Sequence, residues 1–151
     1  MIVAATGHRP NDIKESHQEV QTKARNKLRK ANATRLICGM AEGFDLIAAR
    51  AAMELGIPIT AARPWHTHKV GELWKEDYKA VLEYADKVHV VVDSETYHVS
   101  YLHKRNEWMV DNADAVMAYW NGKESGGTYA CRQYAKKVKK PVANIIKDPP
   151  F

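Results

Sequence analysis

The chain has 151 residues, of which 45% are hydrophobic, and this predicts one globular domain over residues 1–151 with a sizeable core. No apolar run approaches the roughly 20 residues of a membrane-spanning helix, and no basic region precedes the first apolar run as in a secretory leader, so we expect a cytoplasmic protein without a membrane partner. The net charge of +5, gathered in residues 23–30 and 136–140, favours anionic ligands, including nucleic acid, unless these runs are only solvated helix faces.

The first part of the chain alternates strands and helices. An apolar strand over 1–6 is followed by a helix over 13–31, where Ile13, Val20, Ala24 and Leu28 recur at helical spacing. The next predicted elements are a buried strand over 34–39, an Ala-rich helix over 41–55 and a strand over 58–62.

The same alternation continues to the C-terminus, without linker or repeat. The predicted helices cover 70–85, 101–112 and 128–138, and the strands cover 87–92, 114–120 and 141–146. Such alternation is typical of a single three-layer α/β domain, with a mostly parallel sheet and helices on both faces.

The segments rich in glycine, arginine and histidine all follow predicted strands. Because the carboxyl ends of parallel strands meet at one edge of the sheet, we expect these segments to form a ligand pocket there. They are "TGHRP" (6–10), "CGMAEGFD" (38–45), "RPWHTH" (63–68), "DSETYH" (93–98) and "NGKESGGT" (121–128).

The first two segments carry residues suited to an anion. Gly7 permits a tight turn after the first strand, and Arg9 can bind a phosphate with two N–H groups. Gly39 and Gly43 flank a turn into a helix, which leaves backbone N–H groups free at the positive helix end. Asp45 falls in the first helical turn, where it either stabilises the helix or binds a ribose hydroxyl.

The stretch from Ser125 to Thr128 is the strongest phosphate candidate. Gly126 and Gly127 come immediately before the predicted helix, with Ser125 or Thr128 available as its cap. The stretch either holds a phosphate on bare N–H groups or is a glycine-rich turn. Arg105 shares a helical face with residues that pack on the sheet, and we interpret it as directed toward the ligand edge.

Aromatic and histidine residues give weaker signals. Trp65 either stacks on a base or is a hydrophobic residue at the rim, and Tyr97 and Tyr101 are candidates for a lid. His66 and His68 lack a second cluster of ligands, so we expect no metal. No Walker A motif and no complete G-x-G-x-x-G motif is present, and we expect no cofactor.

Five motifs together resemble a known family: "TGHRP", "CGMAEGFD", "RPW", "KRNEWMVDNAD" and "GGT". Their order is similar to the YpsA-like branch of the SLOG superfamily, which includes the DNA-processing protein DprA and the LOG phosphoribohydrolases. The resemblance covers nearly the whole chain and implies a Rossmann-like fold with a nucleotide site at the C-terminal edge of the sheet. The expected ligand or phosphate-binding residues are Gly7, His8, Arg9, Gly39, Met40, Gly43, Asp45, Trp65, Arg105, Asn106, Ser125, Gly126, Gly127 and Thr128.

The resemblance leaves catalysis open. It maps the catalytic arginine of LOG enzymes onto Arg105, but Asn106 stands where LOG has a lysine, and residues 129–132 lack the glutamate that follows the LOG threonine. A carboxylate stabilises the charge that develops when an N-glycosidic bond breaks. The replacements at the same edge are Glu42, Asp45, Asp93 and Glu124.

Three functions therefore remain in view. The first is binding of a nucleotide or nucleotide-derived phosphorylated small molecule, for sensing, sequestration or processing. The alternatives are LOG-like hydrolysis of a nucleoside monophosphate and DprA-like binding of single-stranded nucleic acid. LOG relatives also imply a homodimer.

Overall fold

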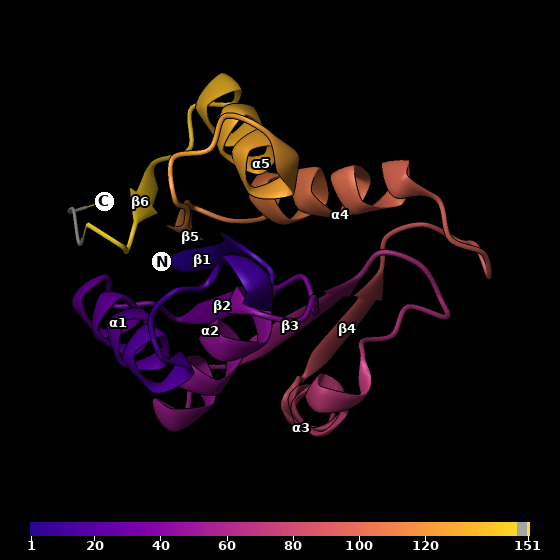
Figure 1. Ribbon diagram of the computed structural model, residues 1–151, viewed down its shortest axis with the longest axis horizontal. Coiled ribbons are helices and arrows are strands. Elements are labelled where there is room, and N and C mark those ends of the chain that lie inside the picture. Colours follow the sequence, from indigo (N-terminus) through magenta and orange to yellow (C-terminus); the bar gives the residue numbers. More distant parts are fainter. Residues whose placement is uncertain (148–150) are drawn as a thin grey trace.

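The computed structural model describes residues 1–147 and Phe151, and a six-stranded sheet forms its centre (Figure 1). The strand order is β4-β3-β2-β1-β5-β6, and every neighbouring pair is parallel. The strands are β1 (Ile2–Gly7), β2 (Arg35–Cys38), β3 (Ile59–Arg63), β4 (Lys87–Val90), β5 (Ala115–Tyr119) and β6 (Val142–Asn144).

Helices cover both faces of the sheet. On one face lie α1 (His17–Lys30), α2 (Phe44–Glu54) and α3 (Lys75–Tyr84), and on the other lie α4 (Val99–Asp111) and α5 (Gly126–Lys137) (Figure 1). Two apolar clusters join these layers: Leu28, Phe44 and Val81 belong to the first, and Met109 and Ala135 to the second. The predicted three-layer, Rossmann-like α/β domain is confirmed.

Two helix starts differ most from the prediction. The first helix begins at His17, because the Ser16 side chain accepts a hydrogen bond from Glu19 N at 3.2 Å and caps it. Ile13 is buried in the preceding loop, so its apolar character reflects packing and not helical position. The helix predicted over 70–85 is a 3-10 turn (Glu72–Trp74) followed by α3, and Leu73 is 93% exposed.

The order of the strands creates a crevice between β1 and β5. The first strand pairs with β2 on one side, as in Val3↔Leu36, and with β5 on the other, as in Val3↔Ala115. The connections after β1 and β5 lead to helices on opposite faces of the sheet. Parallel α/β sheets bind ligands at such a point, outside the carboxyl ends of the strands.

Cys38 and Cys131 are both free and buried. Burial raises the pKa of the Cys131 thiol to about 11 and raises that of Cys38 further. Both thiols are therefore protonated and unreactive near neutral pH. No helix among the described residues is both long and apolar enough to cross a bilayer.

Candidate ligand-binding site

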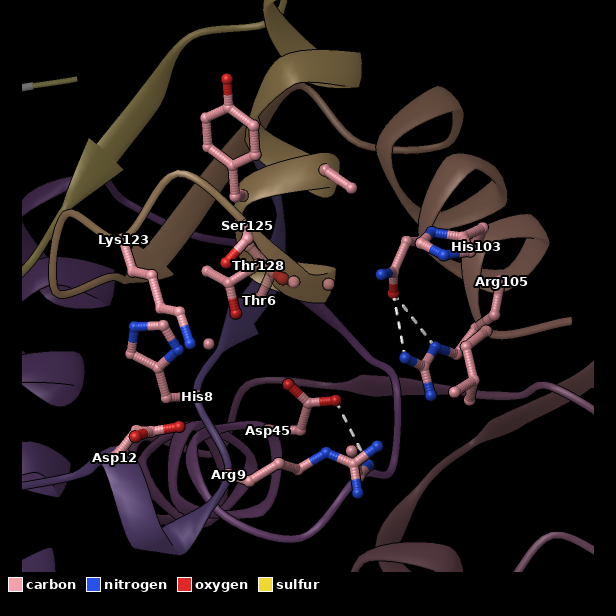
Figure 2. A pocket seen from close by; sticks show the side chains of 18 of the residues that line it. Thr6, His8, Arg9, Asp12, Asp45, His103, Arg105, Lys123, Ser125 and Thr128 are labelled. Carbon is pink, nitrogen blue, oxygen red and sulfur yellow. Dashed lines mark hydrogen bonds between the residues drawn. The ribbon is translucent and has the colours of Figure 1, made fainter. Parts of the chain in front are cut away.

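A cavity of about 640 Å³ opens at the carboxyl ends of β1 and β5 (Figure 2). Its volume falls in the range of small-molecule sites. Four segments distant in the sequence form its walls, and they contribute Thr6, Gly7, His8, Arg9, Asp12, Ala41, Asp45, Val99, Leu102, His103, Arg105, Asn106, Asn121, Lys123, Ser125, Gly126, Gly127, Thr128, Tyr129 and Ala130.

The structure brings most of the sequence-predicted site residues to this cavity. Those that line it are Gly7, His8, Arg9, Asp45, Arg105, Asn106, Ser125, Gly126, Gly127 and Thr128. The remaining four, Gly39, Met40, Gly43 and Trp65, are not among its lining residues. Three of these four, Gly39, Met40 and Gly43, lie in the turn between β2 and α2.

The start of α5 is open toward the cavity. Gly126 and Gly127 are its first residues, not a segment before it, and Ser125 occupies the cap position without a capping hydrogen bond from its side chain. Within residues 1–147 and 151, no acceptor takes a hydrogen bond from the N–H of Gly126, Gly127 or Thr128. The first turn has no acidic residue, and a Cβ added at either glycine would meet no atom within 4 Å. The positive end of α5 therefore faces empty space.

Two loops contribute basic side chains to the cavity that this helix start faces. Arg9 is exposed after β1, and Lys123 lies across the cavity in the loop after β5 (Figure 2). His8 lies next to Lys123, and its Nε2 accepts a hydrogen bond from Asn121 N at 2.9 Å. That bond assigns the proton of the neutral ring to Nδ1, so His8 has a donor left for a ligand.

Arg105 lines the cavity although it is only 5% exposed. It donates from Nη1 to Gly39 O at 3.0 Å, and from Nε and Nη2 to Asn106 Oδ1 at 3.2 and 3.0 Å. An arginine has five N–H groups, so two remain without an acceptor among the described residues. Burial lowers the pKa of Arg105, against the effect of Asp45, yet a guanidinium remains charged near neutral pH.

Asp45 is the buried carboxyl of the site. It is 6% exposed, and its Oδ2 accepts a hydrogen bond from Ala41 N at 3.2 Å. Burial raises the pKa of Asp45, although Arg105, the hydrogen bond from Ala41 and Arg9 all oppose that change. Its oxygen atoms can accept hydrogen bonds from a ligand, and the raised pKa means that the carboxyl takes up a proton more readily than an exposed aspartate does.

Two glycines allow these groups to approach one another. A Cβ at Gly39 would lie 2.8 Å from Asp45 Oδ2 and 3.0 Å from Arg105 Nε. Gly43 has a φ of +95°, and a Cβ there would lie 2.5 Å from His8 O, which accepts a hydrogen bond from Phe44 N at 3.1 Å. Both positions require glycine for close packing within the protein.

Trp65 belongs to a different cluster of rings. Its ring centroid lies 5.1 Å from that of His68, 5.2 Å from Tyr97 and 6.4 Å from Tyr101. These residues pack together after β3 and β4, so the predicted lid tyrosines contact Trp65. His66 bonds to Asp93 at 2.8 Å, and the described part of the chain holds no group of three His, Cys, Asp or Glu side chains arranged for a metal ion.

Several lining residues were not predicted as site residues. Lys123 and Asn121 lie in the segment after β5 that the sequence had placed at the ligand edge, and a basic residue between Gly122 and Gly126 could have identified Lys123. Asp12, Val99 and Leu102 reach the cavity only through the folding of the chain, and nothing in their local sequence distinguishes them.

The sequence matches the model of the YspA SLOG family (YpsA) over residues 3–147. A curated relative, the uncharacterized SPbeta prophage-derived protein YoqJ of Bacillus subtilis (strain 168), is 35% identical over 81 residues, or 44% of this chain and 47% of that protein. The alignment thus spans about half the length of this relative.

Solved structures share the fold at low identity. DprA of Helicobacter pylori, described by its single-stranded DNA binding mode, has a TM-score of 0.72 at 23% identity, covering 94% of this chain and 63% of that one. DprA of Streptococcus pneumoniae has a TM-score of 0.74 at 20% identity, covering 93% and 48%. The molybdenum cofactor carrier protein of Chlamydomonas reinhardtii has a TM-score of 0.61 at 17% identity, and the match covers 93% of this chain and 73% of that one. From the match over residues 3–147, the chain belongs to the YpsA family of SLOG proteins.

Proposed function

We propose that the protein binds a nucleotide or a nucleotide-derived phosphorylated small molecule in the cavity between β1 and β5. The observation that carries the proposal is the open start of α5, whose free N–H groups face a cavity that Arg9 and Lys123 also line. Helix N-termini bind phosphate because their unpaired N–H groups and the helix dipole both favour an anion. In this proposal the phosphate lies on Gly126–Thr128.

The rest of the cavity offers groups suited to the remainder of such a ligand. Asp45 supplies carboxylate oxygens that a sugar hydroxyl can donate to, and Arg105 has two N–H groups free for ligand oxygens. Val99 and Leu102 give the opposite wall an apolar surface for a ring. This combination of an apolar wall with a few polar groups is typical of small-molecule sites.

The similar structures support a binding role. One is described by its binding of single-stranded DNA, and another by its carriage of the molybdenum cofactor. Both descriptions concern binding and not a chemical reaction. At 17–23% identity the likeness is one of fold, so the ligand class for this chain rests on the cavity itself.

The test is calorimetric titration with a panel of nucleoside 5′-monophosphates and the matching nucleosides. We expect at least one monophosphate to bind and its nucleoside to bind at least tenfold more weakly, because charge-assisted hydrogen bonds to the phosphate are lost. Gly127→Ala should lower the affinity for the monophosphate by about tenfold or more, since the added Cβ would occupy the space that the phosphate needs in this proposal.

Lys137→Ala is the matched control, because this exposed lysine lies on α5 and does not line the cavity. It should leave the affinity unchanged. Equal affinity of Gly127→Ala and the parent protein for the monophosphate would place the phosphate elsewhere and contradict the proposal.

A second candidate function is hydrolysis of an N-glycosidic bond. The observation in its favour is Asp45, the one of the four sequence-predicted replacement carboxylates that lines the cavity. Glu42 instead accepts a hydrogen bond from Gly71 N, and Asp93 pairs with His66. Chromatography for free base after incubation with nucleoside monophosphates tests this function. Base release that Asp45→Asn abolishes would establish it, and absence of release across the panel would exclude it for those substrates.

A further inference from the structure

A second cavity, of about 480 Å³, adjoins the first along α5. Tyr129 lines both cavities, and the loop after β5 contributes Lys123 to one and Glu124 to the other. The second cavity is formed by Trp120, Glu124, Tyr129, Arg132, Gln133, Lys136, Lys140 and Val142. The two hollows therefore share one wall at Tyr129.

An aromatic platform is fixed in this second cavity. The Trp120 indole donates from Nε1 to Lys123 O at 2.9 Å, and the Arg132 guanidinium lies 3.7 Å from the centre of its ring. The Tyr129 ring is within 26° of parallel to Trp120, with the centroids 6.3 Å apart. Proteins that bind single-stranded nucleic acid stack nucleobases on aromatic side chains, with cation–π contributions from arginine.

The charge of this cavity is unbalanced. Arg132, Lys136 and Lys140 line it against one acid, Glu124. Within the part of the chain that the structure describes, no carboxylate pairs with Arg132 or Lys136, and the buried Arg132 Nε has no acceptor. Lys140 is committed elsewhere, since its Nζ donates to Ala113 O at 2.7 Å. Arg132 and Lys136 are thus the cations available to an external anion.

We propose that the second cavity binds a second, phosphate-linked nucleotide unit of the ligand held in the first. Its base lies at Trp120 and Tyr129, and Arg132 and Lys136 contact the phosphate. Along α5, which rises about 1.5 Å per residue, the backbone positions of Arg132 and Lys136 lie about 7.5 and 13.5 Å beyond that of Gly127. The inference rests on the proposed function, because the first unit occupies the cavity described above.

Two sources share this chemistry: a soluble dinucleotide, and two consecutive units of a single strand. The experiment titrates the protein with a 5′-phosphorylated mononucleotide, dinucleotide and hexanucleotide of DNA. We expect the dinucleotide to bind about tenfold more tightly than the mononucleotide, because charge-assisted contacts and stacking are added. A further gain for the hexanucleotide identifies a strand, and no further gain identifies a dinucleotide.

Variants locate the gain. Lys136→Ala and Arg132→Ala should each reduce the gain between mononucleotide and dinucleotide while leaving the mononucleotide affinity unchanged, which also shows that the variants are folded. Lys137→Ala removes the same charge from the same helix outside both cavities, and it should retain the full gain.

Two outcomes overturn the inference: equal affinity of the parent protein for mononucleotide and dinucleotide, or a gain that survives both Arg132→Ala and Lys136→Ala. Failure of the proposed function is a distinct result. It would appear as a parent protein that binds no mononucleotide, or as mononucleotide binding that Gly127→Ala does not weaken.

Discussion

Two helices begin beside the cavity after glycine-containing segments, and the protein uses their first turns in opposite ways. At the start of α2, a Cβ on Gly43 would lie 2.5 Å from His8 O, and Asp45 places a carboxylate in the first turn. At the start of α5, a Cβ on Gly126 or Gly127 would meet no atom within 4 Å, and the first turn has no acidic residue.

This difference shows that glycine before a helix has two distinct uses. In α2 the glycine lets the loop after β1 approach closely, and the carboxylate of the helix itself occupies the positive end. In α5 the glycines leave that end unoccupied, so an external anion can reach it. We infer that the start of α2 is closely packed and serves the structure, whereas the start of α5 is open and can bind a ligand.

Among the substitutions at these two helix starts, Gly43→Ala should cause the largest loss of stability. Alanine at a φ of +95° is strained, and its Cβ would also overlap His8 O, so we expect the free energy of unfolding to fall by about 3 kcal/mol. Urea denaturation measures the loss. Gly56→Ala is the matched control, since Gly56 has a φ of +67° in open space and should lose only about 1 kcal/mol. Equal losses would mean that the α2 start is not closely packed.

The pH dependence of stability tests whether the β3 side of the sheet edge is as closed as the α2 start. Burial lowers the pKa of His68 to about 3, with Arg105, Arg63 and Arg9 acting in the same direction. Between these pKa values His68 binds a proton in the unfolded chain but not in the folded protein. The free energy of unfolding therefore falls as the pH drops from 6.5 toward 3. Between pH 7 and pH 5 the loss from this group is roughly 2 kcal/mol.

The measurement compares urea denaturation of the parent protein and His68→Asn at pH 7 and pH 5. The parent should lose more stability than the variant over this interval, whatever the cost of the substitution itself at pH 7. A parallel decline in both proteins would show that His68 is accessible to protons.

Gly127→Ala should have the smallest effect on stability. Its Cβ enters open space, and alanine favours a helix over glycine, so we expect the free energy of unfolding to rise by less than about 1 kcal/mol. Gly126→Ala differs because Gly126 has a φ of +89°, and it should cost about 1 kcal/mol. Thermal or urea denaturation of the two variants shows whether Gly127→Ala raises and Gly126→Ala lowers the stability, as expected. A loss of 2 kcal/mol or more for Gly127→Ala would contradict an open α5 start.

The sequence predicted the elements of the sheet because buried parallel strands are short apolar runs, such as Val3 to Ala5 in β1. It also placed the glycine segments at one edge, since all strands are parallel. Helix starts were less predictable: Ile13 fits a helical pattern, yet it is buried from a loop. The spacing of apolar residues cannot distinguish a residue buried from a loop from one in a helix.

The sequence could not show that the start of α2 is closely packed and the start of α5 is open. The local pattern at Gly39 and Gly43 resembles that at Gly126 and Gly127, and only the distance to neighbouring atoms separates them. Trp65 likewise follows a strand at the ligand edge, but it packs against Tyr97 and His68. Such outcomes depend on contacts between segments remote in the chain, which local patterns do not encode.

The pairing of β1 with β5 has a consequence for how the ligand can be found. Residues from both halves of the chain form the cavity, and they come together only when pairs such as Val3↔Ala115 are made. Contacts over such long sequence separations form at a high entropic cost during folding. A ligand that binds only the assembled cavity therefore stabilises the whole domain, by about 2.7 kcal/mol at a concentration of 100 times its Kd. A melting-temperature screen of cellular metabolites would register that stabilisation for any compound that fills the cavity, whatever its chemical identity.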